Sequence, residues 1–236
     1  MSTPHLAIIG HGKMGRAVEQ LAIERGWAVT TIIDAEANHG GAGITPTSLN
    51  GADVAVEFTT GDAAPANVRA CVRAGCPAVS GTTGWDAERG RVEEDVLAGS
   101  GAMLWSPNFS IGVNLFWQVA EVAARLAGHT ESFDAHILET HHATKRDAPS
   151  GTALALQRLA TAAFGSDIPV TSVRVGAVPG THELLLDAAY EQIRVVHEAR
   201  DRRVFADGAL AAARWLIGRR GVYTMRDFLL AEVSRP

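Results

Sequence analysis

The sequence predicts an α/β protein in which an N-terminal doubly wound parallel sheet is joined to a second, α+β domain with a mixed sheet. Before Pro107, short apolar runs alternate with longer segments of helical periodicity, which is typical of a parallel sheet covered by helices on both faces. After Pro107 this alternation stops, and strands follow one another with polar turns between them. A content of 47% apolar and 20% charged residues over 236 residues provides enough hydrophobic material for a substantial core.

The N-terminal elements follow from the spacing of apolar residues. Residues 6–9 form a continuous apolar run, as expected of a strand buried on both faces. Residues 13–25 place apolar side chains three and four positions apart, which predicts an amphipathic helix. The same criteria predict strands at 28–33, 54–58, 78–79 and 102–105, and helices at 64–74 and 88–98.

The elements after Pro107 follow a different order, because strands there are no longer separated by helices. We expect a helix at 113–126, a strand at 132–140, a helix at 152–164, strands at 171–175, 183–188 and 192–197, a helix at 207–217 and a short tail through 225–233. In the strand at 132–140, Phe133, Ala135 and Ile137 share one face, which predicts that this face packs on helices.

Composition excludes several classes of protein. The 21 Lys and Arg against 26 Asp and Glu give a formal net charge of −5, and no long basic run is present, so we expect no nucleic-acid or membrane partner. Every apolar stretch is shorter than the roughly 18 residues that a membrane-spanning helix needs. Cys71 and Cys76 are too few for a disulfide scaffold, which favours thiols in a reduced, cytoplasmic compartment.

A glycine-rich loop follows the first predicted strand. The pattern G-x-G-x-x-G is formed by Gly10, His11, Gly12, Lys13, Met14 and Gly15. Between a strand and a helix, such a loop allows a tight turn and brings backbone N–H groups to a pyrophosphate, as in Rossmann-like dinucleotide-binding domains. Asp34, at the end of the second strand, is placed to accept hydrogen bonds from ribose hydroxyls, which favours NADH and leaves NADPH possible through Lys13 or Arg16. The alternative is a glycine turn required only for packing.

Three further polar segments follow predicted strands, at the sheet edge where ligands of open α/β sheets bind. The first is Phe58-Thr59-Thr60. The residues of the other two that we expect to border a nicotinamide are Gly81, Thr82, Thr83, Ser106, Pro107, Asn108 and Phe109. Taken singly, each segment is equally compatible with an ordinary turn.

The densest group of reactive side chains lies at residues 139–152. His141, His142 and Lys145 precede a predicted helix whose start is marked by Ser150, Gly151 and Thr152, an arrangement suited to a carboxylate or phosphate. Either imidazole can exchange protons near neutral pH. A zinc site is the more specific alternative. Because the side chains of adjacent residues such as His141 and His142 point in opposite directions on an extended segment, we predict that no metal is bound. A solvated basic loop is the simplest alternative.

These residues resemble a known family. Residues 139–153 read E-T-H-H-A-T-K-R-D-A-P-S-G-T-A, which is similar to the signature E-x-H-H-x-x-K-x-D-A-P-S-G-T-A of the 4-hydroxy-tetrahydrodipicolinate (dihydrodipicolinate) reductases of lysine biosynthesis. Further similar stretches are 81–84 (GTTG), 108–114 (NFSIGVN), 174–180 (RVGAVPG), 205–210 (FADGAL) and 221–227 (GVYTMRD).

The resemblance implies a function and a role for each matching residue. Members of the family use NADH or NADPH to reduce a cyclic dicarboxylate, 4-hydroxy-tetrahydrodipicolinate, to tetrahydrodipicolinate and water. The implied proton-handling residues are His141 and Lys145, and the implied substrate contacts are His142, Ser150, Gly151 and Thr152. Residues 10–15, Asp34, 81–83 and 106–109 correspond to the cofactor site.

The resemblance also implies a domain plan and an assembly. It places residues 1–109 with 209–236 in a dinucleotide-binding domain, and 110–208 in a domain for substrate binding and oligomerisation, through which members form homotetramers. Two other interpretations remain open. One is a different small-acid dehydrogenase with the same plan, and the other is a non-catalytic protein that senses nucleotides.

Overall fold

The computed structural model describes residues 3–233 and divides the chain into two compact units. Unit 1 comprises Met1–Ile111 and Arg203–Pro236, and unit 2 comprises Gly112–Arg202. The second sequence-based boundary, 208/209, falls inside α6 (Arg203–Leu216), which belongs wholly to unit 1. The sequence predicted this helix from residue 207, whereas the structure begins it at Arg203, and Ala206, Ala209 and Leu210 pack into the core of unit 1.

Unit 1 is built on a six-stranded sheet of order β10-β5-β4-β3-β1-β2, in which every pair of neighbours is parallel. Its strands are β1 (His5–Ile9), β2 (Ala28–Ile33), β3 (Val54–Glu57), β4 (Ala78–Ser80), β5 (Ala102–Trp105) and β10 (Gly221–Tyr223). Its helices are α1 (Lys13–Glu24), the 3-10 helix η1 (Ala35–Ala37), α2 (Ala64–Arg73), α3 (Asp86–Ala98), α6 and α7 (Met225–Val233). The predicted doubly wound parallel sheet is confirmed.

Both faces of this sheet are buried, which explains the continuous apolar character of its strands. In β1, Leu6 and Ile8 point into a core shared with α1, α6 and α7, while Ala7 and Ile9 point into a second core shared with α2 and α3. From β1 the chain runs outward to β2 and then returns to β3 on the other side. The strand order therefore reverses between β1 and β3, and ligands of such sheets bind at the carboxyl ends of the strands at this point.

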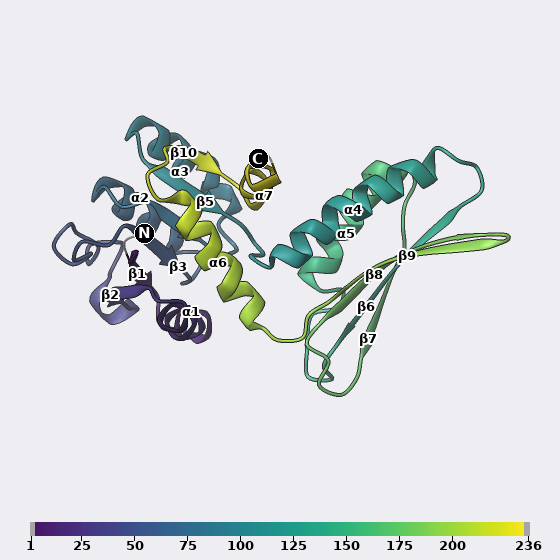
Figure 1. Ribbon diagram of the computed structural model, residues 1–236, viewed down its shortest axis with the longest axis horizontal. Helices are drawn as coiled ribbons and strands as arrows, with labels where there is room; N and C mark the ends of the chain where they lie inside the picture. Colours follow the sequence, from purple (N-terminus) through teal and green to yellow (C-terminus); the bar gives the residue numbers. More distant parts are fainter. Residues whose placement is uncertain (1–2, 234–236) are drawn as a thin grey trace. The chain divides into compact units, whose positions relative to one another are not determined.

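Unit 2 is a four-stranded mixed sheet covered on one face by two helices (Figure 1). The strand order is β7-β6-β8-β9; β6 and β7 are parallel, and the other pairs are antiparallel. The elements are α4 (Ile111–Gly128), β6 (Asp134–His141), α5 (Gly151–Phe164), β7 (Val170–Arg174), β8 (Thr181–Ala188) and β9 (Glu191–Glu198). Ile137, Leu184 and Leu186 face the helices, as the spacing in the sequence predicts for Ile137.

Two elements near the C-terminus differ from the sequence-based prediction of a tail. Residues 221–223 form β10, which pairs with β5 at the edge of the sheet, and residues 225–233 form α7. A three-residue strand is too short to show a periodicity, and α7 is anchored by Met225, Phe228 and Leu229 in the core of unit 1. Within the described residues, no helix is long and apolar enough to cross a membrane.

Candidate active site

The glycines of the loop that follows β1 differ in what surrounds them. Gly10 has φ +89°, and a Cβ there would lie 2.3 Å from the carbonyl oxygen of Phe58. A Cβ on Gly15 would lie 2.0 Å from the carbonyl oxygen of Gly10, so this glycine lets α1 approach the strand. A Cβ on Gly12, by contrast, would meet nothing within 4 Å. The packing interpretation therefore explains Gly10 and Gly15, whereas Gly12 leaves open space at the start of α1.

The start of α1 has the properties of an anion site. Gly12 is the N-cap residue and provides no side-chain oxygen to the first turn of the helix. Helix N-termini carry N–H groups without intrahelical partners and a partial positive charge, both of which favour a phosphate. Lys13 is exposed beside this turn, while Met14 packs against the core. These residues suit the pyrophosphate of a dinucleotide.

Asp34 lies next to the same loop. Its Oδ1 accepts hydrogen bonds from the backbone N–H of Ala35 at 2.9 Å and of His11 at 3.2 Å. These two bonds hold the pKa of the Asp34 carboxyl below its usual value, so the exposed carboxylate is ionised at neutral pH. Arg16 donates from Nε to the carbonyl oxygen of His11 at 3.1 Å, which brings a cation to this end of the loop. An anionic Asp34 can accept from two ribose hydroxyls and repels a phosphate, whereas Arg16 attracts one.

A buried carboxylate, Glu57, joins the polar segments that follow β3 and β4. Its oxygens accept from Oγ of Ser80 at 2.5 Å and from Oγ1 of Thr82 at 2.9 Å, and Thr59 also donates to it. Thr82 in turn accepts from the backbone N–H of Thr59 at 2.8 Å. Burial raises the pKa of Glu57, and the surrounding hydroxyl groups oppose that rise. Sequence reasoning missed Glu57, and the one signal for it was a single charge in an apolar strand.

The residues predicted to border a nicotinamide divide into two groups. Ser106, Asn108 and Phe109 are buried, like Thr82. The side chain of Ser106 bonds to the backbone of Asn108, and the Phe109 ring packs edge-on against Phe58 at a centroid distance of 6.0 Å. Gly81 lies against the Phe58 ring, where a Cβ would be 1.9 Å from Cε1. Thr83 and Pro107 are exposed. The side chains of the buried residues are directed into the protein, so these residues offer their backbone groups to the edge of the sheet.

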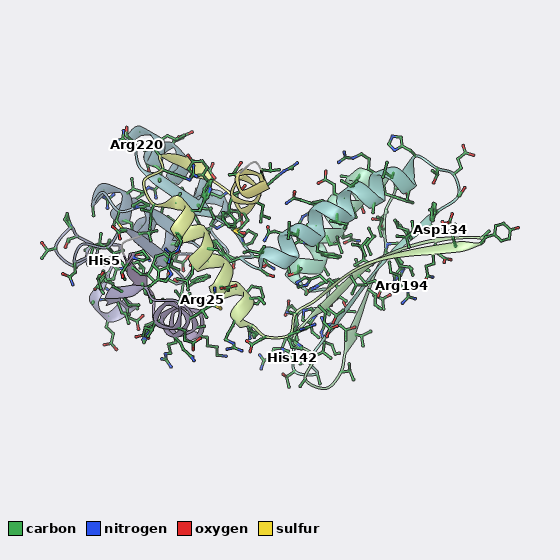
Figure 2. The ribbon with its side chains drawn as sticks, in the orientation of Figure 1. His5, Arg25, Asp134, His142, Arg194 and Arg220 are labelled. Atoms are coloured by element: carbon green, nitrogen blue, oxygen red, sulfur yellow. The ribbon has the colours of Figure 1, made fainter. Side chains whose placement is uncertain are left out.

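In unit 2, the two adjacent histidines lie at the end of β6 and face different surroundings. His141 is 7% exposed and belongs to the helix-covered face of the sheet. His142 lies where the loop begins, at the opposite end of β6 from Asp134 (Figure 2), and its Nδ1 is 2.9 Å from Oγ1 of Thr144. This divergence agrees with the geometry of an extended segment.

His141 lies against a buried carboxylate, a contact that the sequence alone did not reveal. Oε2 of Glu139 contacts Nδ1 of His141, and Oε1 of Glu139 accepts from Nη2 of Arg174 at 2.7 Å. Burial raises the pKa of Glu139, but Arg174, Ser172 and His141 together outweigh this effect and the pKa is lowered. Burial also lowers the pKa of His141, assisted by the charges of Lys145 and Arg174 and opposed by Glu139. At neutral pH this pair is therefore a carboxylate beside a neutral imidazole.

Lys145 and the start of α5 complete the group of polar residues in unit 2. Nζ of Lys145 lies 2.8 Å from both carboxylate oxygens of Asp147. Ser150 caps α5 by accepting from the N–H of Ala153 at 3.2 Å, and its hydroxyl is 3.1 Å from Nε2 of His182. Gly151 is exposed in the first turn of the helix, with open space where a Cβ would be. Thr152 follows it in the same turn. An ammonium and a helix N-terminus are the groups that bind a carboxylate.

His182, on β8, is a second residue that sequence reasoning missed. Its ring packs against that of His141 at a centroid distance of 5.1 Å. Burial lowers the pKa of His182 to about 4, and the neighbouring His141 acts in the same direction. Glu139, His141 and His182 place potential metal ligands within 4.8 Å of one another. Because Arg174 already occupies Glu139 with a positive charge, this cluster is poorly suited to a cation, and the absence of a metal stays a prediction.

Together, the doubly wound unit with its glycine loop and the second unit with its imidazoles and ammonium define a class. The chain is a two-unit, pyridine-nucleotide-dependent oxidoreductase. More particularly, it belongs to the dihydrodipicolinate reductase family, because residues 4–109 match the model described as dihydrodipicolinate reductase, N-terminus, and residues 112–229 match the one described as its C-terminus.

Individual relatives agree with this family assignment. The chain is 38% identical to a 4-hydroxy-tetrahydrodipicolinate reductase of Thiobacillus denitrificans, covering 95% of this chain and 97% of the relative. It is 37% identical to the enzyme of that name from Archaeoglobus fulgidus, covering 92% and 96%. Among solved structures, dipicolinate-bound dihydrodipicolinate reductase from Paenisporosarcina sp. TG-14 has the same fold, with a TM-score of 0.80 at 20% identity over 94% of this chain and 98% of that one.

Proposed function

We propose that this protein reduces 4-hydroxy-tetrahydrodipicolinate with NAD(P)H to tetrahydrodipicolinate and water, in the diaminopimelate route to lysine. The reaction is supported by 38% identity to a reductase of that name over 95% of the chain. The geometric observation that carries the proposal is the cluster at the start of α5. There an imidazole, an ammonium and a helix N-terminus come together in one unit, as a dianionic substrate requires.

The substrate is bound through its carboxylates. One carboxylate lies at the N-terminus of α5, where Ser150, Gly151 and Thr152 surround it with hydroxyl and N–H groups, and His142 supplies a further contact. A hydroxyl group has one proton. If His182 donates from Nε2 to the Ser150 hydroxyl, which also accepts from Ala153, the hydroxyl proton of Ser150 is directed to the carboxylate.

Two residues handle protons in the reaction. The overall change adds one hydride and one proton to the substrate and releases one water. NAD(P)H supplies the hydride to an electron-poor conjugated ring, which leaves negative charge to be neutralised. Lys145, as an ammonium, turns from Asp147 to donate a proton to that charge. His141 is neutral in the free protein, so it can take a proton from the ring and return it to the leaving hydroxyl as water departs, with no net proton consumed.

The cofactor binds to unit 1. Residues 10–15 hold the pyrophosphate at the start of α1, Asp34 accepts from the ribose hydroxyls, and residues 81–83 and 106–109 border the nicotinamide. NADH is the preferred cofactor because Asp34 is ionised. NADPH is also accepted, because Arg16 and Lys13 are exposed next to the loop.

The protein assembles as a homotetramer through the open face of the sheet in unit 2. Both helices of the unit pack on Ile137, Leu184 and Leu186, so the side chains that alternate with these face away from the helices. Val173 and Val196, on that opposite face, are 37% and 51% exposed. A cytoplasmic location belongs to the same proposal and agrees with Cys71 and Cys76 as buried free thiols.

The test is NADH oxidation in the presence of substrate generated in place by condensing pyruvate with aspartate semialdehyde, followed by near-ultraviolet absorbance. We expect NADH loss that requires the condensing enzyme and both of its substrates. A parallel series with NADPH measures the cofactor preference. Binding of NADH without substrate-dependent oxidation refutes the proposed reaction, and inhibition by pyridine-2,6-dicarboxylate distinguishes it from another small-acid dehydrogenase.

A further inference from the structure

A partly buried arginine, Arg174 at the end of β7, connects the segments that carry His141 and Lys145. Its Nη2 donates to Oε1 of Glu139 at 2.7 Å and to the carbonyl oxygen of Asp147 at 2.7 Å. Glu139 contacts His141, and the carboxylate of Asp147 binds Nζ of Lys145. One guanidinium therefore contacts a partner of each side chain to which proton handling is assigned. In the sequence, Arg174 begins the stretch 174–180 that resembles the family, but the resemblance assigned it no role.

The sheet determines why Arg174 reaches this position. In the parallel pairing of β6 with β7, Arg174 is the register partner of His141, and Ser172 is that of Glu139. Residues two apart on a strand share a face, so Glu139, His141 and Arg174 all lie on the helix-covered side. The Glu139 side chain is fully buried, and that of Arg174 is 18% exposed. A carboxylate this deep is ionised only beside a cation, and Arg174 is that cation.

Glu139 also decides which nitrogen of His141 faces the substrate. The charged or titratable groups around His141 are Glu139 on its own strand, Arg174 on β7, Lys145 on the loop and His182 on β8. Of these, the carboxylate of Glu139 is the one that contacts Nδ1. A carboxylate beside Nδ1 favours the tautomer with the proton on Nδ1, which leaves the lone pair on Nε2. A Cβ on Gly180 would lie 3.0 Å from Nε2, so the glycine keeps the space in front of this nitrogen open.

We propose that Arg174 is a positioning residue for the reduction. It holds Glu139 against His141, and through the Asp147 carbonyl it fixes the loop that carries Lys145, so that the two proton-handling side chains keep one spacing. The proposal rests on the proposed function, because His141 and Lys145 take their roles from it. A guanidinium suits this task because its plane fixes the direction of both N–H groups of Nη2, whereas a lysine ammonium lies one bond closer to Cα on a flexible stem and rotates.

The test compares His141 titration with turnover in the full-length protein. His141 is one of nine histidines, and its NMR signal is assigned by its loss in His141→Gln. Arg174→Gln removes a positive charge and raises the pKa of His141, whereas Glu139→Gln removes a negative charge and lowers it. Each shift is expected to be about 1–3 units. Arg158→Gln, an exposed change on α5, is the matched control and leaves the titration unchanged.

Turnover measurements distinguish a positioning role of Arg174 from an effect of its charge alone. We expect Arg174→Gln to lower kcat by roughly 10²-fold, the loss associated with a misplacement of about 1 Å, while the KM for NADH stays the same. Arg174→Lys restores the titration of His141 towards the wild-type value without restoring kcat, because the lysine nitrogen lies one bond closer to Cα than Nη2 does and its flexible stem does not hold Glu139 and Asp147 at a fixed spacing.

Opposite titration shifts together with the loss of kcat support the proposal. Unchanged titration in both variants, shifts in the same direction, or wild-type kcat in Arg174→Gln overturn it. If circular dichroism shows that Arg174→Gln does not fold, the His141 titration in Glu139→Gln becomes the test. An unchanged pKa of His141 in that variant overturns the proposal. If the wild-type protein shows no turnover, the proposed function fails, and the titration still decides whether Arg174 and Glu139 control His141.

Discussion

Replacement of Lys145 by alanine tests the proton-donor role. A positioned side chain that transfers a proton contributes roughly 10²–10⁴-fold to a reaction rate. We expect kcat of Lys145→Ala to fall by a factor in this range, which corresponds to about 3–5 kcal/mol of lost transition-state stabilisation. The affinity for NADH should stay the same, because residues 10–15 and Asp34 belong to the other unit.

The structure predicts that this loss is not a folding defect. The side chain of Lys145 is 21% exposed and its partner Asp147 is 59% exposed, so the pair is screened by water. Such pairs contribute about 0–1 kcal/mol to stability. Asp147 loses its cation in the variant but remains hydrated, and the melting temperature should change by only a few degrees.

The assay is substrate-dependent NADH oxidation at saturating NADH, with fluorescence titration of NADH alongside it. Arg146→Ala is the matched control, because Arg146 is the adjacent exposed cation and carries no assigned role. The control should keep wild-type kcat, which separates a specific ammonium from the general positive charge of the loop. Equal kcat in Lys145→Ala and the wild type refutes the role of Lys145, and an equal loss in both variants refutes its specificity.

Three further predictions concern the cofactor, pH and assembly. Asp34→Ala should narrow the preference for NADH over NADPH, measured as the ratio of kcat/KM values; an unchanged ratio places the ribose contact elsewhere. His182 has a pKa of about 4 in the folded protein against an ordinary value of 6.5, so the unfolded chain binds its proton first as the pH falls. The contribution of neutral His182 to the free energy of unfolding is complete above pH 6.5 and falls by about 3 kcal/mol towards pH 4. The free energy of unfolding in urea should therefore depend less on pH between 6.5 and 4 in His182→Gln than in the wild type. Val196→Glu should lower the mass found by light scattering from tetramer to smaller species, whereas Val119→Glu, an equally exposed change on α4, should not; equal masses contradict assembly through the open sheet face.

The sequence was most informative where one physical constraint acts alone. The strand at residues 5–9 is buried on both faces, so its apolar run identifies it without further information. The loop that follows contains glycines at positions 10 and 15, where a Cβ would clash with a backbone carbonyl oxygen. The start of α5 is marked by Ser150, which does act as its N-cap. Each of these signals is local, and each places its element correctly.

The contacts that organise the site are not local, and the sequence did not predict them. Arg174 meets Glu139 because two strands pair in parallel, and 35 positions separate the two residues in the chain. His182 reaches Ser150 across 32 positions. Glu57 is one charge within an apolar strand, a signal that becomes interpretable only when Ser80 and Thr82 lie beside it. Such partners depend on register, which a single sequence does not specify.

The most direct test of the account is a crystal structure of the protein with NADH and pyridine-2,6-dicarboxylate, a planar mimic of the substrate. We predict one carboxylate at the N-terminus of α5, within hydrogen-bond distance of Ser150 and Gly151. Nζ of Lys145 should turn from Asp147 towards the ligand, and Nε2 of His141 should face the ring. A ligand bound away from this cluster, with Lys145 still paired to Asp147, would contradict the assignment of the active site.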